Sequence, residues 1–132
     1  GFERAVGIVG AAAAKLREDG LHVATIGFCW GGTIALLSNT RLGLPAVSYY
    51  GGRSVPFLGE PLRAPMLFHF GERDTLIPPE DVDRHRAAYP GAPMHLYPAE
   101  HGFHCDQRKD YEPESARLAH RRTLDFLAGA VA

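Results

Sequence analysis

The chain has 132 residues, of which 45% are hydrophobic and 22% are charged, and its formal net charge is −1. This composition is typical of a folded globular protein and excludes a disordered or fibrous chain. The 14 basic residues are balanced by 15 acidic ones, so no positive field favours binding to nucleic acid or to an anionic membrane. A small, neutral or mildly charged substrate suits this balance better.

Targeting signals are not visible in the sequence. The longest mostly apolar run, residues 21–37, is interrupted by polar residues and glycines and is too short for a transmembrane helix. The first residues lack the basic segment and apolar core of a signal peptide. Two cysteines, Cys29 and Cys105, fit a reducing compartment better than a disulfide scaffold. We therefore expect a cytoplasmic protein.

Short apolar strands alternate with helices along the whole chain, which we treat as one domain, residues 1–132. Periodicity and breaker residues predict helices over 2–19, 31–39, 79–89 and 113–127, and strands over 21–28, 46–50, 64–71 and 94–97. This alternation predicts an α/β fold with a mostly parallel sheet flanked by helices. Ligands of such sheets bind beyond the carboxyl ends of the strands.

The turn after the first predicted strand has the form Gly-x-Cys-x-Gly, with Cys29 between Gly27 and Gly31. This is the pattern of a nucleophile elbow, in which glycines allow a tight turn that exposes the central side chain. A thiol at the start of a helix is favoured as thiolate, the nucleophilic form. The alternative is that Cys29 is a small buried hydrophobic residue.

An acid and a base follow Cys29 in the order that α/β-hydrolases use. Asp74 and His101 each lie in the loop that follows a predicted strand, so both are expected at the same end of the sheet as Cys29. The sequence of nucleophile, acid and histidine is that of α/β-hydrolases rather than of other triad folds. We assign His101 as general base, Asp74 as its orienting acid, and the Trp30 N–H as an oxyanion donor.

Other interpretations of these residues remain open. Asp74 could only cap the turn after its strand, and His101 could be an exposed histidine, as we expect for His85, His95 and His120.

The loop after the fourth strand allows two further interpretations. His101, His104, Cys105 and Asp106 could bind zinc, although their spacing matches no known zinc motif. Cys29 and Cys105 could form a redox pair, since this loop should approach the elbow. We favour a site without metal or organic cofactor.

Three motifs together resemble the dienelactone hydrolase family, the carboxymethylenebutenolidase-like branch of the α/β-hydrolases. They are Gly-Phe-Cys-Trp-Gly-Gly at 27–32, Phe-Gly-Glu-Arg-Asp-Thr-Leu-Ile-Pro at 70–78 and Tyr-Pro-Ala-Glu-His-Gly-Phe-His at 97–104. The closing segment 121–127 is similar too. The resemblance implies hydrolysis of a small ester, lactone or thioester through a thioester acyl-enzyme, with Cys29, His101 and Asp74 as the triad. We place Tyr50, Phe103 and His104 in the substrate pocket.

The resemblance covers only the C-terminal part of the family fold. Full-length members have an N-terminal part with further strands and a second oxyanion donor, so the strand over 23–28 is expected to have an unpaired apolar edge. We expect a fragment, a homo-oligomer, or a subunit completed by another chain. An alternative function is a non-catalytic binding or interaction fragment. Dienelactone-specific members carry an arginine for the substrate carboxylate shortly after the histidine. In this chain residues 104–107 are His-Cys-Asp-Gln, and the next arginine is Arg108. The resemblance therefore assigns no particular substrate.

Overall fold

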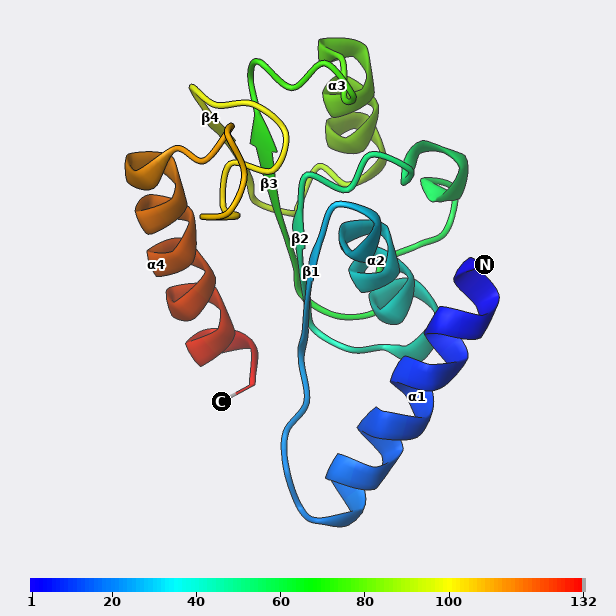
Figure 1. Ribbon diagram of the computed structural model, residues 1–132. Helices are drawn as coiled ribbons and strands as arrows, with labels where there is room; N and C mark the ends of the chain where they lie inside the picture. Colours follow the sequence, from blue (N-terminus) through cyan, green and yellow to red (C-terminus); the bar gives the residue numbers. More distant parts are fainter. Residues whose placement is uncertain (132) are drawn as a thin grey trace.

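Four strands of the computed structural model, which describes residues 1–131, form one parallel sheet between two layers of helices (Figure 1). They are paired in the order β1-β2-β3-β4, which is also their order along the chain. Their bounds are β1 Thr25–Phe28, β2 Ala46–Tyr49, β3 Met66–Gly71 and β4 Met94–Tyr97. The α/β prediction with a parallel sheet is confirmed.

Helices cover both faces of the sheet. They are α1 Phe2–Glu18, α2 Trp30–Leu42, α3 Pro79–Ala88 and α4 Pro113–Ala130, with a short 3-10 helix, η1 Val55–Phe57, between β2 and β3. Helix α2 packs on β1 and β2, α1 packs on α2, and α4 covers the opposite face (Figure 1). In the described part of the chain, no helix has the length and apolar character needed to cross a membrane.

Two expectations about local structure are corrected. The first strand begins at Thr25 rather than at residue 21, because its partner strand begins at Ala46, opposite Thr25, and offers no earlier pairing. His85 is 1% exposed rather than a surface residue. It lies three residues after Val82 on α3, so both face the sheet, and its ring packs edge-on against Phe70.

The core is centred on β2 and β3, whose residues are buried at every position, as expected for parallel strands covered on both sides. Alternate residues face opposite layers. Ser48 and Phe68 face α2 and α3, whereas Tyr49 and His69 face α4. The sheet face under α4 is therefore partly polar.

A buried hydrogen-bonded group attaches α4 to this face. The Thr123 hydroxyl lies 2.7 Å from the Tyr49 hydroxyl and 2.9 Å from His69 Nε2. His69 Nδ1 is hydrogen-bonded to the Tyr97 hydroxyl at 2.8 Å. A neutral imidazole meets both contacts with one donor and one acceptor nitrogen. Burial, followed by the nearby His95 and Arg122, lowers the pKa of His69 to about 3.

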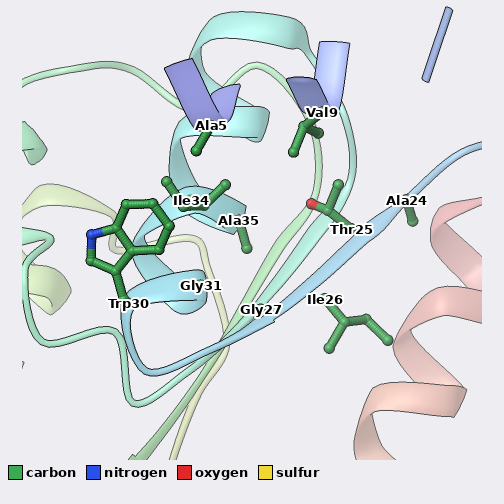
Figure 2. A pocket seen from close by; sticks show the side chains of 10 residues that line it. All are labelled: Ala5, Val9, Ala24, Thr25, Ile26, Gly27, Trp30, Gly31, Ile34 and Ala35. Atoms are coloured by element: carbon green, nitrogen blue, oxygen red, sulfur yellow. The ribbon is translucent and has the colours of Figure 1, made fainter. Parts of the chain in front are cut away.

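The outer edge of β1 has no neighbouring strand among residues 1–131. Ile26 and Phe28 on this strand are 45% and 42% exposed. A groove of about 440 Å³ runs beside the strand, between α1 and the start of α2. Figure 2 shows Thr25 and Ile26 pointing to opposite sides of β1, with Thr25 on the side of the groove that α1 and α2 form. The sheet is therefore open at the strand that leads into Cys29.

We expect His69 to make folding sensitive to acid. Between its unfolded pKa of 6.5 and its folded pKa of about 3, the unfolded chain binds a proton that the folded chain does not. The free energy of unfolding should therefore fall by about 1.4 kcal/mol per pH unit from His69 as the pH drops through this window. Urea unfolding of the parent chain and of His69→Asn from pH 7 to pH 4 measures this slope.

The His69→Asn variant should show a shallower pH dependence, even if it is less stable at pH 7. Parallel curves for the two proteins would contradict the prediction. Heteronuclear NMR provides an independent measurement, since His69 should keep one protonated and one unprotonated nitrogen at pH 5.

Candidate active site

Cys29 lies at a strained turn between β1 and α2. Its backbone has φ 57° and ψ −122°, a region that non-glycine residues rarely adopt and that costs of order 1–3 kcal/mol. The Cys29 N–H donates to the Tyr49 carbonyl at 3.0 Å, and the Cys29 carbonyl accepts from the Gly32 N–H at 2.9 Å. These bonds fix the turn to β2 and to the first turn of α2, and they place Cys29 at the helix N-cap.

Two glycines permit this turn because other backbone atoms occupy the space of a side chain. A Cβ on Gly27 would lie 1.7 Å from the Gly31 carbonyl oxygen. A Cβ on Gly32 would lie 2.8 Å from the Tyr49 carbonyl oxygen. Gly31, which completes the sequence pattern, has open space at this position. Gly27 and Gly32 are therefore the sterically required pair.

The Cys29 thiol is half-buried, and the groups around it shift its pKa in opposite directions. Burial raises the pKa of Cys29, and the charges of Asp74 and Cys105 act in the same direction. The Arg108 guanidinium, whose Nη1 lies 3.9 Å from Cys29 Sγ, lowers the pKa. The net direction is upward, so the thiol form predominates at neutral pH and a base is needed to remove its proton.

Asp74 and His101 form a hydrogen-bonded pair at the carboxyl end of the sheet. His101 Nδ1 donates to Asp74 Oδ2 at 2.7 Å, and the Leu76 N–H donates to Asp74 Oδ1 at 2.8 Å. The Asp74 side chain is fully buried, and that of His101 is 13% exposed. The carboxylate is thus held by one backbone bond and fixes the orientation of the imidazole, with Nε2 free to act on another group.

The approach of the two loops depends on Gly71, the last residue of β3. A Cβ on Gly71 would lie 2.4 Å from the Ala99 carbonyl oxygen. The same carbonyl accepts a hydrogen bond from the Arg73 N–H at 3.0 Å. The loop after β3 is therefore joined directly to the loop after β4, which brings Asp74 beside His101.

Cys29 and His101 line one cavity of about 270 Å³, together with Trp30, Arg53 and Leu76. No hydrogen bond joins Cys29 and His101 within residues 1–131. The Trp30 N–H, at the first position of α2, has no acceptor in the described backbone and lies next to the thiol in sequence. The Trp30 side chain stacks on Phe2 of α1, with ring centroids 5.2 Å apart.

A second cavity of about 360 Å³ adjoins the other side of Cys29. Tyr50 and His104 contribute to its wall. The pKa of Tyr50 is raised, mainly by burial and next by the charge of Cys29. Phe103 is fully buried between Tyr50 and Tyr97, so the structure places it behind the cavity wall rather than in the cavity. The lining residues are Phe28, Cys29, Tyr50, His104, Cys105 and Arg108.

Sequence reasoning did not assign a role to Arg108, Arg53 or Leu76, all of which line the two cavities. Arg108 is seven residues after His101, and only the folding of the intervening loop brings it to Cys29.

In residues 1–131, no group of three or more histidine, cysteine or acidic side chains is placed to hold a metal ion. Both cysteines are free.

A parallel sheet with a strained thiol turn after β1 and an acid–histidine pair after β3 and β4 defines the α/β-hydrolase class. The chain belongs to the dienelactone hydrolase family, whose sequence model matches residues 3–131. The family prediction is confirmed.

Several known proteins are similar to the chain over most of its length. A Yersinia pestis protein named "Putative carboxymethylenebutenolidase" is 38% identical, over 86% of this chain and 49% of that protein. The "Carboxymethylenebutenolidase" of Pseudomonas sp. (strain P51) is 31% identical, over 80% of this chain and 47% of that protein.

The same relation is seen among solved structures. The crystal structure of a "Putative Dienelactone Hydrolase" from Klebsiella pneumoniae superimposes with a TM-score of 0.86 at 29% identity, covering 96% of this chain and 61% of that one. The chain therefore spans about half the length of the curated relatives that it matches.

We expect Gly27→Ala to disrupt the elbow, whereas Gly31→Ala serves as its matched control. The Gly27 variant must move backbone atoms of α2, and its free energy of unfolding should fall by about 3 kcal/mol. Gly31→Ala meets no atom within 4 Å and should be no less stable than the parent chain. Chemical denaturation of the three proteins measures the difference. Equal losses in the two variants would refute the steric account.

Proposed function

We propose that the chain carries the active site of a hydrolase that cleaves a small ester, lactone or thioester by acyl transfer to Cys29. The hydrogen bond between Asp74 and His101, at the carboxyl ends of the strands where Cys29 also lies, is the observation that carries the proposal. The names of the curated relatives support an ester or lactone substrate. The triad assignment rests on this geometry and on the motif order.

The reaction follows from the protonation states around Cys29. Since burial raises the thiol pKa, His101 acts as a general base that accepts the thiol proton while Sγ attacks the carbonyl carbon. The tetrahedral intermediate collapses to a thioester on Cys29. It expels the alkoxide of an ester or lactone, or the thiolate of a thioester substrate, and this leaving group takes the proton from His101. Water, deprotonated by His101, then attacks the thioester and releases the acid and the Cys29 thiol.

The oxyanion formed in each step needs donors that are already oriented. The Trp30 N–H supports this role because it adjoins the nucleophile, begins α2 and has no described backbone acceptor. The positive end of the α2 dipole adds to the stabilisation of negative charge at this point. The two cavities beside Cys29, of about 270 and 360 Å³, suit a small substrate. No organic cofactor or metal enters the proposed mechanism.

A second candidate function is that of a binding or interaction fragment. The specific observation that favours it is the open edge of β1, with exposed Ile26 and Phe28. Exposed apolar edge strands pair readily with other strands. We propose that a second copy of the chain covers this edge when the 132-residue chain is alone in solution.

The two free cysteines support the cytoplasm as the compartment.

The proposed triad predicts that Asp74→Asn lowers kcat for a p-nitrophenyl ester by about 10³-fold or more. The amide cannot accept the Nδ1 proton as the carboxylate does, so the imidazole is left in the wrong tautomer or orientation. Steady-state kinetics of the folded variant measures this effect.

Cys29→Ala is the matched control for that experiment, since it removes the nucleophile and should abolish turnover while circular dichroism remains unchanged. Turnover that survives in Cys29→Ala would overturn the hydrolase assignment. An undiminished rate in Asp74→Asn would remove only Asp74 from the triad. A parent chain without turnover that self-associates through β1 would favour the interaction fragment.

The open edge predicts that Ile26→Lys weakens self-association of the chain. A lysine at the centre of the paired edge would be buried or repelled by its copy, so the dissociation constant should rise about tenfold, equivalent to about 1.4 kcal/mol. Leu118→Lys is the control, because Leu118 is a 43% exposed residue of α4 that lies beside β4, at the opposite edge of the sheet. Analytical ultracentrifugation measures both. Equal effects of the two substitutions would contradict edge pairing.

A further inference from the structure

Arg108 is the cationic side chain in contact with the thiol. Its Nη1 lies 3.9 Å from Cys29 Sγ, and both residues line the same cavity. No carboxylate among residues 1–131 forms a salt bridge with Arg108. The guanidinium charge is therefore available to a negative charge on the sulfur.

The loop holds the Arg108 side chain against Gly102, directly beside His101. A Cβ on Gly102 would lie 2.8 Å from Arg108 Nε and 2.9 Å from its Cδ and Cζ. Gly102 also has φ +77°, a conformation that glycine adopts without strain. Because Gly102 has no side chain, the Arg108 side chain can pass over this position and its guanidinium can reach Cys29.

Turns fix the backbone on both sides of Arg108. Its N–H donates to the Cys105 carbonyl at 3.1 Å, and its carbonyl accepts from the Tyr111 N–H at 3.2 Å. The Glu112 N–H closes the loop on the Phe103 carbonyl at 3.1 Å. The contact with Cys29 is therefore made by a side chain whose backbone is held at both ends.

Among the charged groups of the described chain that act on the Cys29 thiol, only Arg108 lowers its pKa. Asp74 and Cys105 raise the thiol pKa, as does burial, and Arg108 lowers it. Tyr50 and His104 face Cys29 from the wall of the larger cavity, and burial favours their neutral forms. His101 and Arg53 line the smaller cavity.

We propose that Arg108 is a positioning residue for the nucleophile. Its guanidinium lies over Gly102 and stabilises the Cys29 thiolate. This inference rests on the proposed function, because it assigns Arg108 a role through the proposed nucleophile. It adds a fourth side chain to the triad. Proton transfer from Cys29 to His101 produces a thiolate, and a cation already in contact with the sulfur lowers the free energy of that state.

The test measures the ionisation of Cys29 directly, without ester turnover. The rate of alkylation by iodoacetamide is followed from pH 6 to pH 11, and mass spectrometry of proteolytic peptides separates Cys29 from Cys105. Arg108→Gln should move the midpoint of the Cys29 profile upward by about one pH unit, so that alkylation at pH 7 is about tenfold slower. Arg108→Lys, which keeps the charge, should restore part of the shift.

Lys109→Gln is the matched control, since it removes a neighbouring exposed charge and should leave the midpoint where it is in the parent chain. Added salt should reduce the difference between the parent and Arg108→Gln, because it screens the charge of the partly exposed guanidinium. Equal midpoints for the parent and Arg108→Gln would overturn the proposal, as would an equal shift in Lys109→Gln. A parent without esterase activity would overturn the proposed function alone, since alkylation still reports the thiolate.

Discussion

The close contact between α2 and the first two strands is the constraint on which the site depends. The Gly31 carbonyl occupies the space that a side chain on Gly27 would need, and the Tyr49 carbonyl does the same for Gly32. With the helix so near the sheet, the chain can pass from β1 to α2 only through a tight turn, and Cys29 takes its positive φ there. The strain at Cys29 is thus maintained by backbone packing, and it presents the thiol at the helix N-terminus.

A similar contact organises the opposite side of the site. The Ala99 carbonyl approaches Gly71 and accepts from the Arg73 N–H, so the loops after β3 and β4 form one packed unit. Asp74 is held within this unit and orients His101. The nucleophile and the acid–base pair therefore belong to different strands, and the register of the parallel sheet sets their separation.

Much of this arrangement could be predicted because it is local in sequence. Helical periodicity, glycine turns and strand order placed Cys29, Asp74 and His101 at one edge. Contacts across the fold could not be read in this way. Arg108 reaches Cys29 only because its loop turns back over Gly102, and the burial of His85 depends on which face of α3 meets the sheet. The glycine pattern was also incomplete, since the packing requirement falls on Gly32 rather than on Gly31.

The balance of forces on the Cys29 thiol connects these features to the chemistry. A thiol that was already ionised would need no base, and an acid–histidine pair beside it would have little to do. Burial instead raises its pKa, and the contacting Arg108 guanidinium offsets this in part. The sulfur is therefore protonated at rest but close to a group that stabilises its anion. In such a site His101 must remove the proton during attack, which is the role for which Asp74 orients it. The same burial that disfavours the free thiolate strengthens its attraction to the guanidinium, since the local dielectric constant is lower than that of water.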